Sequence, residues 1–183
     1  ISGYRLIMTA KASFRKALQE GCRRAAQKGL CVRVLTVAPW SEAFRLVYGN
    51  EDVADNYLKV LTDLGRYQQE YGIRLQVRMT EKPIFNDTYK VDDRFITGPY
   101  LHCTNERNQK ITARDFFSLD INDPKKELYD IIYKDYMAVW DSADYELDLS
   151  ALHQLCSQEN ILQAAAEEKM RWLQQICPPR KQG

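Results

Sequence analysis

The sequence predicts an α/β domain with a mixed, largely parallel sheet flanked by helices. Two strand-like runs, LCVRVLTV at 30–37 and IRLQVRM at 73–79, each follow a helix-like segment that ends at a glycine. Because a helical crossover joins parallel strands of one sheet, this order favours strand–helix–strand units. With 45% hydrophobic and 28% charged residues over 183 positions, the composition is typical of one soluble domain.

Apolar periodicity defines the elements of the first half. In 12–28, Leu18 and Cys22 recur at helical spacing, with Thr9 or Ser13 as the expected N-cap and Gly29 as the stop. Alternating β-branched residues at 30–37 and 73–79 are typical of strands. The expected order is a strand at 4–8, a helix at 12–28, a strand at 30–37, a loop to residue 50, a helix at 51–71 ending at Gly72, and a strand at 73–79.

The second half predicts a hairpin, short strands and two helices. Asp92-Asp93 is typical of a tight turn between strands at 89–91 and 94–97. Further strands are expected at 102–104 and 116–121, and helices at 124–141 and 149–177. The last helix carries an apolar stripe that either docks on its own chain or pairs with a second copy: Leu152, Leu155, Leu162, Ala166, Leu173 and Ile176. We therefore expect an α/β domain at 1–146 and a helical extension for packing or dimerisation at 147–183.

Charge is balanced overall and segregated along the chain. The 26 Lys and Arg residues nearly match the 25 Asp and Glu residues, for a net charge of +1. Residues 1–49 nevertheless hold nine basic and two acidic side chains, whereas 115–148 hold three basic and ten acidic ones. Either the basic segment attracts nucleic acid or another anion, or the two segments neutralise each other within the chain or across a dimer.

Several classes of protein and site are disfavoured. No apolar run approaches the roughly 18 residues that span a bilayer, so we expect no membrane partner and a cytoplasmic location. The five cysteines form no CxxC pair, which argues against a disulfide framework and a zinc site. A glycine-rich phosphate loop and a GxSxG nucleophile motif are both missing from the sequence. We expect no cofactor and no bound metal.

Two segments are candidates for binding an anion. The start of the first helix carries Thr9, Lys11 and Ser13 where a parallel strand leads into a helix, so these residues either bind an anion with free backbone N–H groups or cap the helix. The segment 83–104 is the densest in polar and aromatic residues. Its acids Asp87, Asp92 and Asp93 either bind a divalent cation or form a turn that caps its own backbone.

The layout resembles the phospholipase D-like superfamily. The resemblance rests on LCVRVLTVAPWSEA, on IRLQVRM, on NDTYKVDDRFITGPYLH and on the later LYDIIYKDYMAVWDSA, and it covers about 1–146. It is closest to catalytically degenerate members that serve as C-terminal domains of bacterial regulators and defence-type proteins. The resemblance implies the fold of that superfamily.

The motif of active members, H-x-K-x4-D, is missing. If Asp92 takes the Asp place, Phe85 and Asp87 stand where His and Lys belong. If Asp93 takes it, Asn86 and Thr88 stand there instead. Neither register supplies a nucleophilic His or a Lys that neutralises phosphoryl oxygens, so we do not expect an active phosphodiesterase.

The sequence thus predicts a non-catalytic ligand-sensing or interaction module of a bacterial regulator or defence effector. Its ligand would be a nucleotide or a nucleic-acid backbone, in a pocket between 83–104 and the strand ends. The candidate ligand-binding residues are Thr9, Lys11, Ser13, Arg78, Asn86, Tyr89, Asp93 and His102. The alternatives are a phosphodiesterase or nuclease in which His102 and the acids bind metal, and an oligomerisation domain. Because the sequence starts at Ile1, we also expect a longer protein, with a homodimer or a contact to a domain outside this chain.

Overall fold

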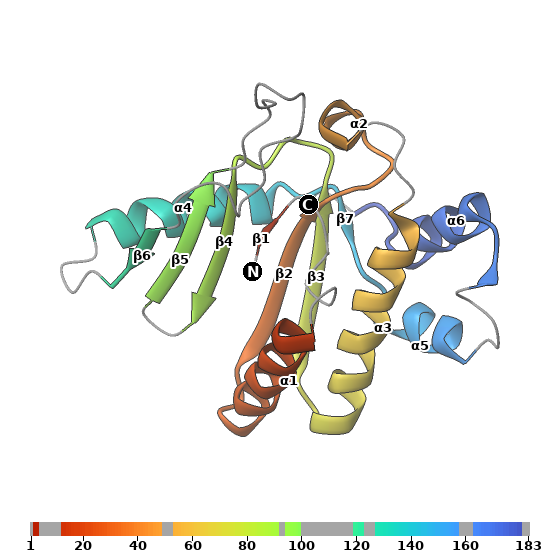
Figure 1. The fold of residues 1–183 in the computed structure, drawn as a ribbon, viewed down its shortest axis with the longest axis horizontal. Helices are drawn as coiled ribbons and strands as arrows, with labels where there is room; N and C mark the ends of the chain where they lie inside the picture. Colours follow the sequence, from red (N-terminus) through yellow and green to blue (C-terminus); the bar gives the residue numbers. More distant parts are fainter. Residues whose placement is uncertain are drawn as a thin grey trace.

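The computed structural model describes residues 2–3, 12–48, 53–91, 94–99, 119–122, 127–157 and 163–180 (Figure 1). These residues form a seven-stranded mixed sheet in the order β6-β5-β4-β1-β2-β3-β7. The predicted strands at 4–8 and 102–104 and the predicted Asp92-Asp93 turn lie outside the described residues. None of the helices in the described part of the chain is long and apolar enough to cross a bilayer.

The centre of the sheet is parallel, as the strand–helix–strand pattern predicts. Ser2 pairs with Leu35 across β1 and β2, and all seven residues of β2 pair with β3 in the same direction. The elements of this part are β1 (Ser2–Gly3), α1 (Ala12–Gln27), β2 (Cys31–Val37), α2 (Glu42–Tyr48), α3 (Ala54–Tyr71) and β3 (Arg74–Thr80). The predicted loop before residue 50 contains the short helix α2, whose start is capped because Ser41 Oγ accepts the Phe44 N–H at 3.1 Å.

The outer strands are antiparallel, so the prediction of a largely parallel sheet holds only for β1, β2 and β3. Thr88 pairs with Ser2 and joins an antiparallel group to the parallel centre. The elements of the second half are β4 (Asn86–Val91), β5 (Arg94–Pro99), β6 (Leu119–Ile121), α4 (Glu127–Asp141) and β7 (Tyr145–Glu146). The predicted hairpin is confirmed as β4–β5, and it is longer than expected because pairing continues to Asn86 and Pro99.

Two glycines end helices as predicted. Gly29 follows α1 with φ of 63°, and Gly72 follows α3 with φ of 67°. Both values are left-handed, a region that glycine enters without a side-chain clash. The Gly72 N–H donates to the Gln68 carbonyl and closes the last turn of α3.

The core lies on both faces of the sheet, because its main cluster includes side chains of α1 and α3 and also Trp140 of α4. In Figure 1, α1 and α3 lie in front of the sheet and α4 lies behind it. Tyr57 of α3 is fully buried, and its hydroxyl donates to the Val37 carbonyl at 2.7 Å. A second, smaller cluster of Phe95, Ile121 and Tyr129 packs α4 on β5 and β6. Two helix layers therefore enclose the sheet centre.

The C-terminal segment differs from the single long helix that the sequence predicts. It forms α5 (Leu149–Cys156) and α6 (Ala166–Ile176), which both pack on α3. Leu152, Leu155, Leu173 and Ile176 are buried within the chain, Ala166 is exposed, and Leu162 lies outside the described residues. The described part of the stripe therefore docks on its own domain, and homodimer formation stays a prediction without support from it.

Candidate ligand-binding site

Four of the predicted ligand-binding residues belong to the part of the chain that the structure describes. These four residues do not lie together at one site. Arg78 lies on β3, Asn86 is exposed at the start of β4, and Tyr89 is on β4 beside a cavity. Ser13 is the second residue of α1. Thr9, Lys11, Asp93 and His102 lie outside the described residues.

Arg78 holds the fold together at the back of the sheet. Its Nη1 donates to the Trp140 carbonyl at 2.9 Å, and its Nε donates to Glu146 Oε2 at 3.2 Å. The guanidinium carbon lies 4.4 Å from the centre of the Trp140 ring, and the side chain is only 13% exposed. Arg78 therefore links β3 to α4 and β7. Its low exposure is consistent with this structural role and leaves little of the side chain accessible to a ligand.

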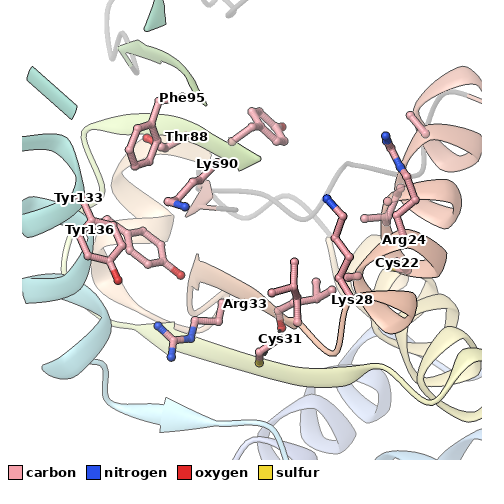
Figure 2. Close-up of a pocket in the computed structure, with 17 residues that line it drawn as sticks. Cys22, Arg24, Lys28, Cys31, Arg33, Thr88, Lys90, Phe95, Tyr133 and Tyr136 are labelled. Carbon is pink, nitrogen blue, oxygen red and sulfur yellow. Dashed lines mark hydrogen bonds between the residues drawn. The ribbon is translucent and has the colours of Figure 1, made fainter. Parts of the chain in front are cut away.

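A cavity of about 550 Å³ lies between α1, β2, β4 and α4 (Figure 2). This volume is within the roughly 300–1,000 Å³ range of small-ligand sites. The strand residues that line it are Cys31, Val32 and Arg33 of β2, Thr88, Tyr89 and Lys90 of β4, and Phe95 of β5. The sequence predicts a pocket between the segment 83–104 and the strand ends. The cavity includes residues of that segment, on β4 and β5, but its other walls come from α1, β2 and α4.

Four cations line the cavity from two sides. In Figure 2, Arg33 and Lys90 approach Tyr136 from β2 and β4, whereas Arg24 and Lys28 lie on the α1 side. No Asp or Glu is among the lining residues that the structure describes. The nearest described acid on α1, Glu20, pairs with Arg23 at 2.8 Å and with Arg24 at 3.8 Å. The lining thus carries a local positive charge within a chain of nearly zero net charge.

Contacts to aromatic rings orient the cations on the α4 side. The Arg33 guanidinium lies 5.6 Å from the Trp140 ring centre, and its Nε donates to Gln76 Oε1 at 3.3 Å. Lys90 Nζ lies 5.6 Å from the Tyr129 ring centre and 6.0 Å from that of Phe95. Such cation–π contacts restrict where each cation can lie beside the cavity.

Two tyrosines of the cavity stay protonated. Burial, with a smaller contribution from the charge of Asp87, raises the pKa of Tyr89 to about 12. Burial also raises the pKa of Tyr136 above its usual value. At neutral pH both side chains are therefore neutral phenols. Each phenol O–H can donate a hydrogen bond, and the oxygen of an anionic ligand can accept it.

The cavity has thiols but no described groups for hydrolysis. Burial raises the pKa of Cys22 to about 11, so its thiol is not a nucleophile at neutral pH. Cys31 Sγ lies 3.6 Å from Gln76 Oε1. Neither His nor a carboxylate is among the described lining residues, and the described residues contain no cluster of three metal-ligating side chains. The described lining can bind and orient an anion, and it supplies no general base.

Two acids of the predicted acidic segment have ion-pair partners outside the basic segment 1–49. Asp120 pairs with Arg94, and Glu146 pairs with Arg78 and Arg180 at 3.2 and 3.4 Å. All three cations lie outside the basic segment 1–49. Asp120 and Glu146 therefore compensate cations of other segments, and neutralisation of the basic segment by the remaining acids stays a prediction.

Comparison of the chain with protein-family models, curated proteins and solved structures finds no match. The resemblance to the phospholipase D-like superfamily therefore stays a prediction. The structure establishes a mixed α/β fold with the cavity described above.

Sequence reasoning missed most of this cavity. Arg33, Lys90 and Tyr136 come from three distant segments that meet only in the folded chain. The excess of basic residues at 1–49 was the available signal for Arg24, Lys28 and Arg33. Lys90 lies in the segment 83–104, which the sequence predicts as one wall of the pocket, although it was not among the candidate residues. Tyr136 carried no signal, because its segment is explained by the apolar pattern of a helix.

Proposed function

We propose that this chain is a non-catalytic module that binds an anionic ligand in the cavity between α1, β2, β4 and α4. The observation that carries the proposal is the lining of four cations without a carboxylate among the described lining residues. As the sequence suggests, a nucleotide or a nucleic-acid backbone is the first ligand class to test, in a bacterial regulator or defence effector.

The arrangement of the side chains supports this ligand class. Arg33 and Lys90 lie on one side of the cavity, and Arg24 and Lys28 lie on the other, so an anion between them is approached from both. Tyr89, Phe95, Tyr133 and Tyr136 add aromatic surface. Aromatic rings beside cations are what a base and its phosphates require, because stacking and charge pairing act on different parts of the ligand.

The non-catalytic part of the proposal rests on the sequence and on the described lining. The His and Lys of H-x-K-x4-D are replaced by Phe85 and Asp87 or by Asn86 and Thr88. Phe85 is 65% exposed, and Asn86 is exposed as well. Neither the phenyl ring of Phe85 nor the amide of Asn86 can act as the nucleophile that the His of the motif supplies.

The test measures binding of pyrophosphate, of a nucleoside triphosphate and of a single-stranded DNA oligonucleotide by calorimetry and fluorescence anisotropy. In Lys28→Glu/Lys90→Glu, affinity for the anion that binds is expected to fall by about tenfold or more, because two charged contacts are reversed. Affinity is also expected to fall steeply with added salt. The control is Arg45→Glu/Lys134→Glu, which changes net charge equally at exposed residues outside the cavity.

Two results would contradict the proposal. Equal loss of affinity in both double variants would show that overall charge, not the cavity, attracts the anion. Hydrolysis of bis-p-nitrophenyl phosphate above background would contradict the non-catalytic part, and its abolition in His102→Ala would favour the phosphodiesterase alternative.

A further inference from the structure

α1 carries a row of exposed cations that begins at the cavity. Arg24 and Lys28 line the cavity and are also exposed to solvent (Figure 2). Lys16 and Arg23 are exposed as well, but they are not among the residues that line the cavity. We call these four residues the α1 stripe. The two cavity cations on α1 are therefore the inner end of a longer positively charged surface.

The packing of α1 decides which way the stripe faces. Leu18 is buried in the core, and Gln19 Nε2 donates to Tyr71 Oη of α3 at 3.0 Å. Because an α-helix turns by about 100° per residue, Lys16 and Arg23 lie within about 20° of each other, on the side away from Leu18. The two cavity cations lie on the flank opposite Gln19. The stripe therefore runs from the cavity flank to the outer side of α1.

The stripe is too long for one compact anion. Lys16 and Lys28 are separated along the helix axis by about 18 Å, because each residue adds about 1.5 Å. An ion pair forms only when its charged atoms lie within about 4 Å. One phosphate group therefore contacts one end of the stripe, and several linked phosphates are needed to fill it.

One acid, Glu20, lies within the stripe. Its carboxylate accepts two hydrogen bonds from Arg23, at 2.8 and 2.9 Å, and lies 3.8 Å from Arg24. The side chains of Glu20, Arg23 and Arg24 are 46%, 48% and 62% exposed. Exposed ion pairs contribute little to stability, and a phosphate offers arginine the same two-pronged geometry as a carboxylate. Phosphates can therefore replace Glu20 as the partner of both arginines.

The cavity and the α1 stripe together offer the two surfaces that a single nucleic-acid strand needs. Tyr89, Phe95 and Tyr136 give the cavity aromatic surface for a base, and the stripe supplies cations for the phosphates that follow it. Only an unpaired strand can place a base in such a cavity, because the bases of a duplex are stacked and paired.

We infer that the ligand is a single-stranded nucleic acid, which places one base in the cavity and lays its backbone along the α1 stripe. The inference rests on the proposed function, because the cavity is the site of the base. It goes further by naming a polymer as the ligand and by assigning phosphate contacts to Lys16 and Arg23, outside the cavity.

The test compares thymidine triphosphate with an oligothymidylate of about ten nucleotides, by calorimetry and fluorescence anisotropy at several salt concentrations. In Lys16→Gln/Arg23→Gln, affinity for the oligonucleotide is expected to fall about tenfold, because two phosphate contacts are lost. The slope of log affinity against log salt is expected to decrease in magnitude by about 1.4, since each contact to a single strand contributes about 0.7. Affinity for the triphosphate is expected to stay within about twofold, because the cavity is intact.

Two further variants control for charge and for folding. Arg45→Gln/Lys134→Gln removes the same net charge at exposed residues outside the stripe and the cavity, and it is expected to leave both affinities unchanged. Glu20→Gln is expected to raise affinity for the oligonucleotide about threefold or more, because it releases Arg23 and Arg24 and removes a repulsive charge. A gain in affinity cannot result from loss of the fold.

The outcomes separate this inference from the proposed function. Triphosphate binding with an unchanged oligonucleotide salt slope in Lys16→Gln/Arg23→Gln would overturn the single-strand ligand and leave the anion site in place. Binding of an oligoglutamate, or of the annealed duplex, as tight as that of the single strand would overturn it too, because neither offers an unpaired base. No binding of oligonucleotide, triphosphate or pyrophosphate would overturn both.

Discussion

Tyr89 shows how burial changes the behaviour of a single side chain in this cavity. Its phenol loses water on folding and lies near the charge of Asp87, and both effects disfavour the phenolate, so the pKa rises from about 10 to about 12. The folded state therefore holds this proton at pH values where the unfolded chain has released it. Stability from this group is complete below pH 10 and is lost as the pH rises from 10 toward 12.

We therefore predict that Tyr89→Phe unfolds with a weaker dependence on alkaline pH than the unsubstituted chain. Between pH 9 and pH 11 the unfolding free energy of the unsubstituted chain is expected to fall by about 1.4 kcal/mol more than that of Tyr89→Phe. The measurement is urea unfolding at both pH values, with Tyr133→Phe, an exposed tyrosine of α4, as the control. Parallel losses in the unsubstituted chain and Tyr89→Phe would contradict the raised pKa.

At the scale of elements, one ion pair joins α6 to α3. Lys169 of α6 is buried, and its Nζ lies 2.5 Å from Asp55 Oδ1 in the first turn of α3. Asp55 also faces the exposed Lys59 at 4.0 Å. A buried cation depends on its partner because removal of the acid leaves a charge without compensation in a low-dielectric site.

This asymmetry predicts unequal costs for the two ends of the pair. Lys169→Met is expected to change the unfolding free energy by less than about 1 kcal/mol, because the apolar replacement keeps the volume and removes the buried charge. Asp55→Ala is expected to cost about 2–3 kcal/mol, below the buried-pair range because Asp55 is 39% exposed. Chemical denaturation measures both, with Lys59→Met as a near-neutral control. Equal costs for the two substitutions would argue against the buried charge as the cause.

For the whole molecule, the apolar stripe of α5 and α6 belongs to the core. Leu152 and Leu173 are fully buried, and the helices that carry them pack on α3. Each buried leucine contributes about 1.5–3 kcal/mol, against a total stability of about 5–15 kcal/mol for a domain. The C-terminal helices are thus part of the folding unit.

Leu152→Asp/Leu173→Asp is therefore expected to unfold the chain, and the exposed-site variant Leu46→Asp is expected to leave it folded. Circular dichroism follows the fold, and light scattering follows the mass. A double variant that stays folded while its mass falls to that of a monomer would show instead that these leucines hold a dimer.

The sequence by itself determined the central parallel part of the fold. The apolar periodicity of α1 and α3, the alternation of β2 and β3 and the stops at Gly29 and Gly72 are local signals, so each was predictable within its own segment. The mixed α/β class followed from the order of these elements. The short elements α2 and β7 gave weaker signals, since seven and two residues carry little periodicity.

Tertiary structure decided the rest, because it depends on contacts between distant segments. Thr88 pairs with Ser2 only in the folded sheet, and this pairing brings Lys90 level with Arg33. Arg78 acts as a structural residue because β7 and the end of α4 surround it. Likewise, the leucines of the C-terminal segment lie inside one chain because α3 offers them a surface there. Local patterns encode which face of an element is apolar, whereas the neighbour that covers that face is set by the packing of the whole chain.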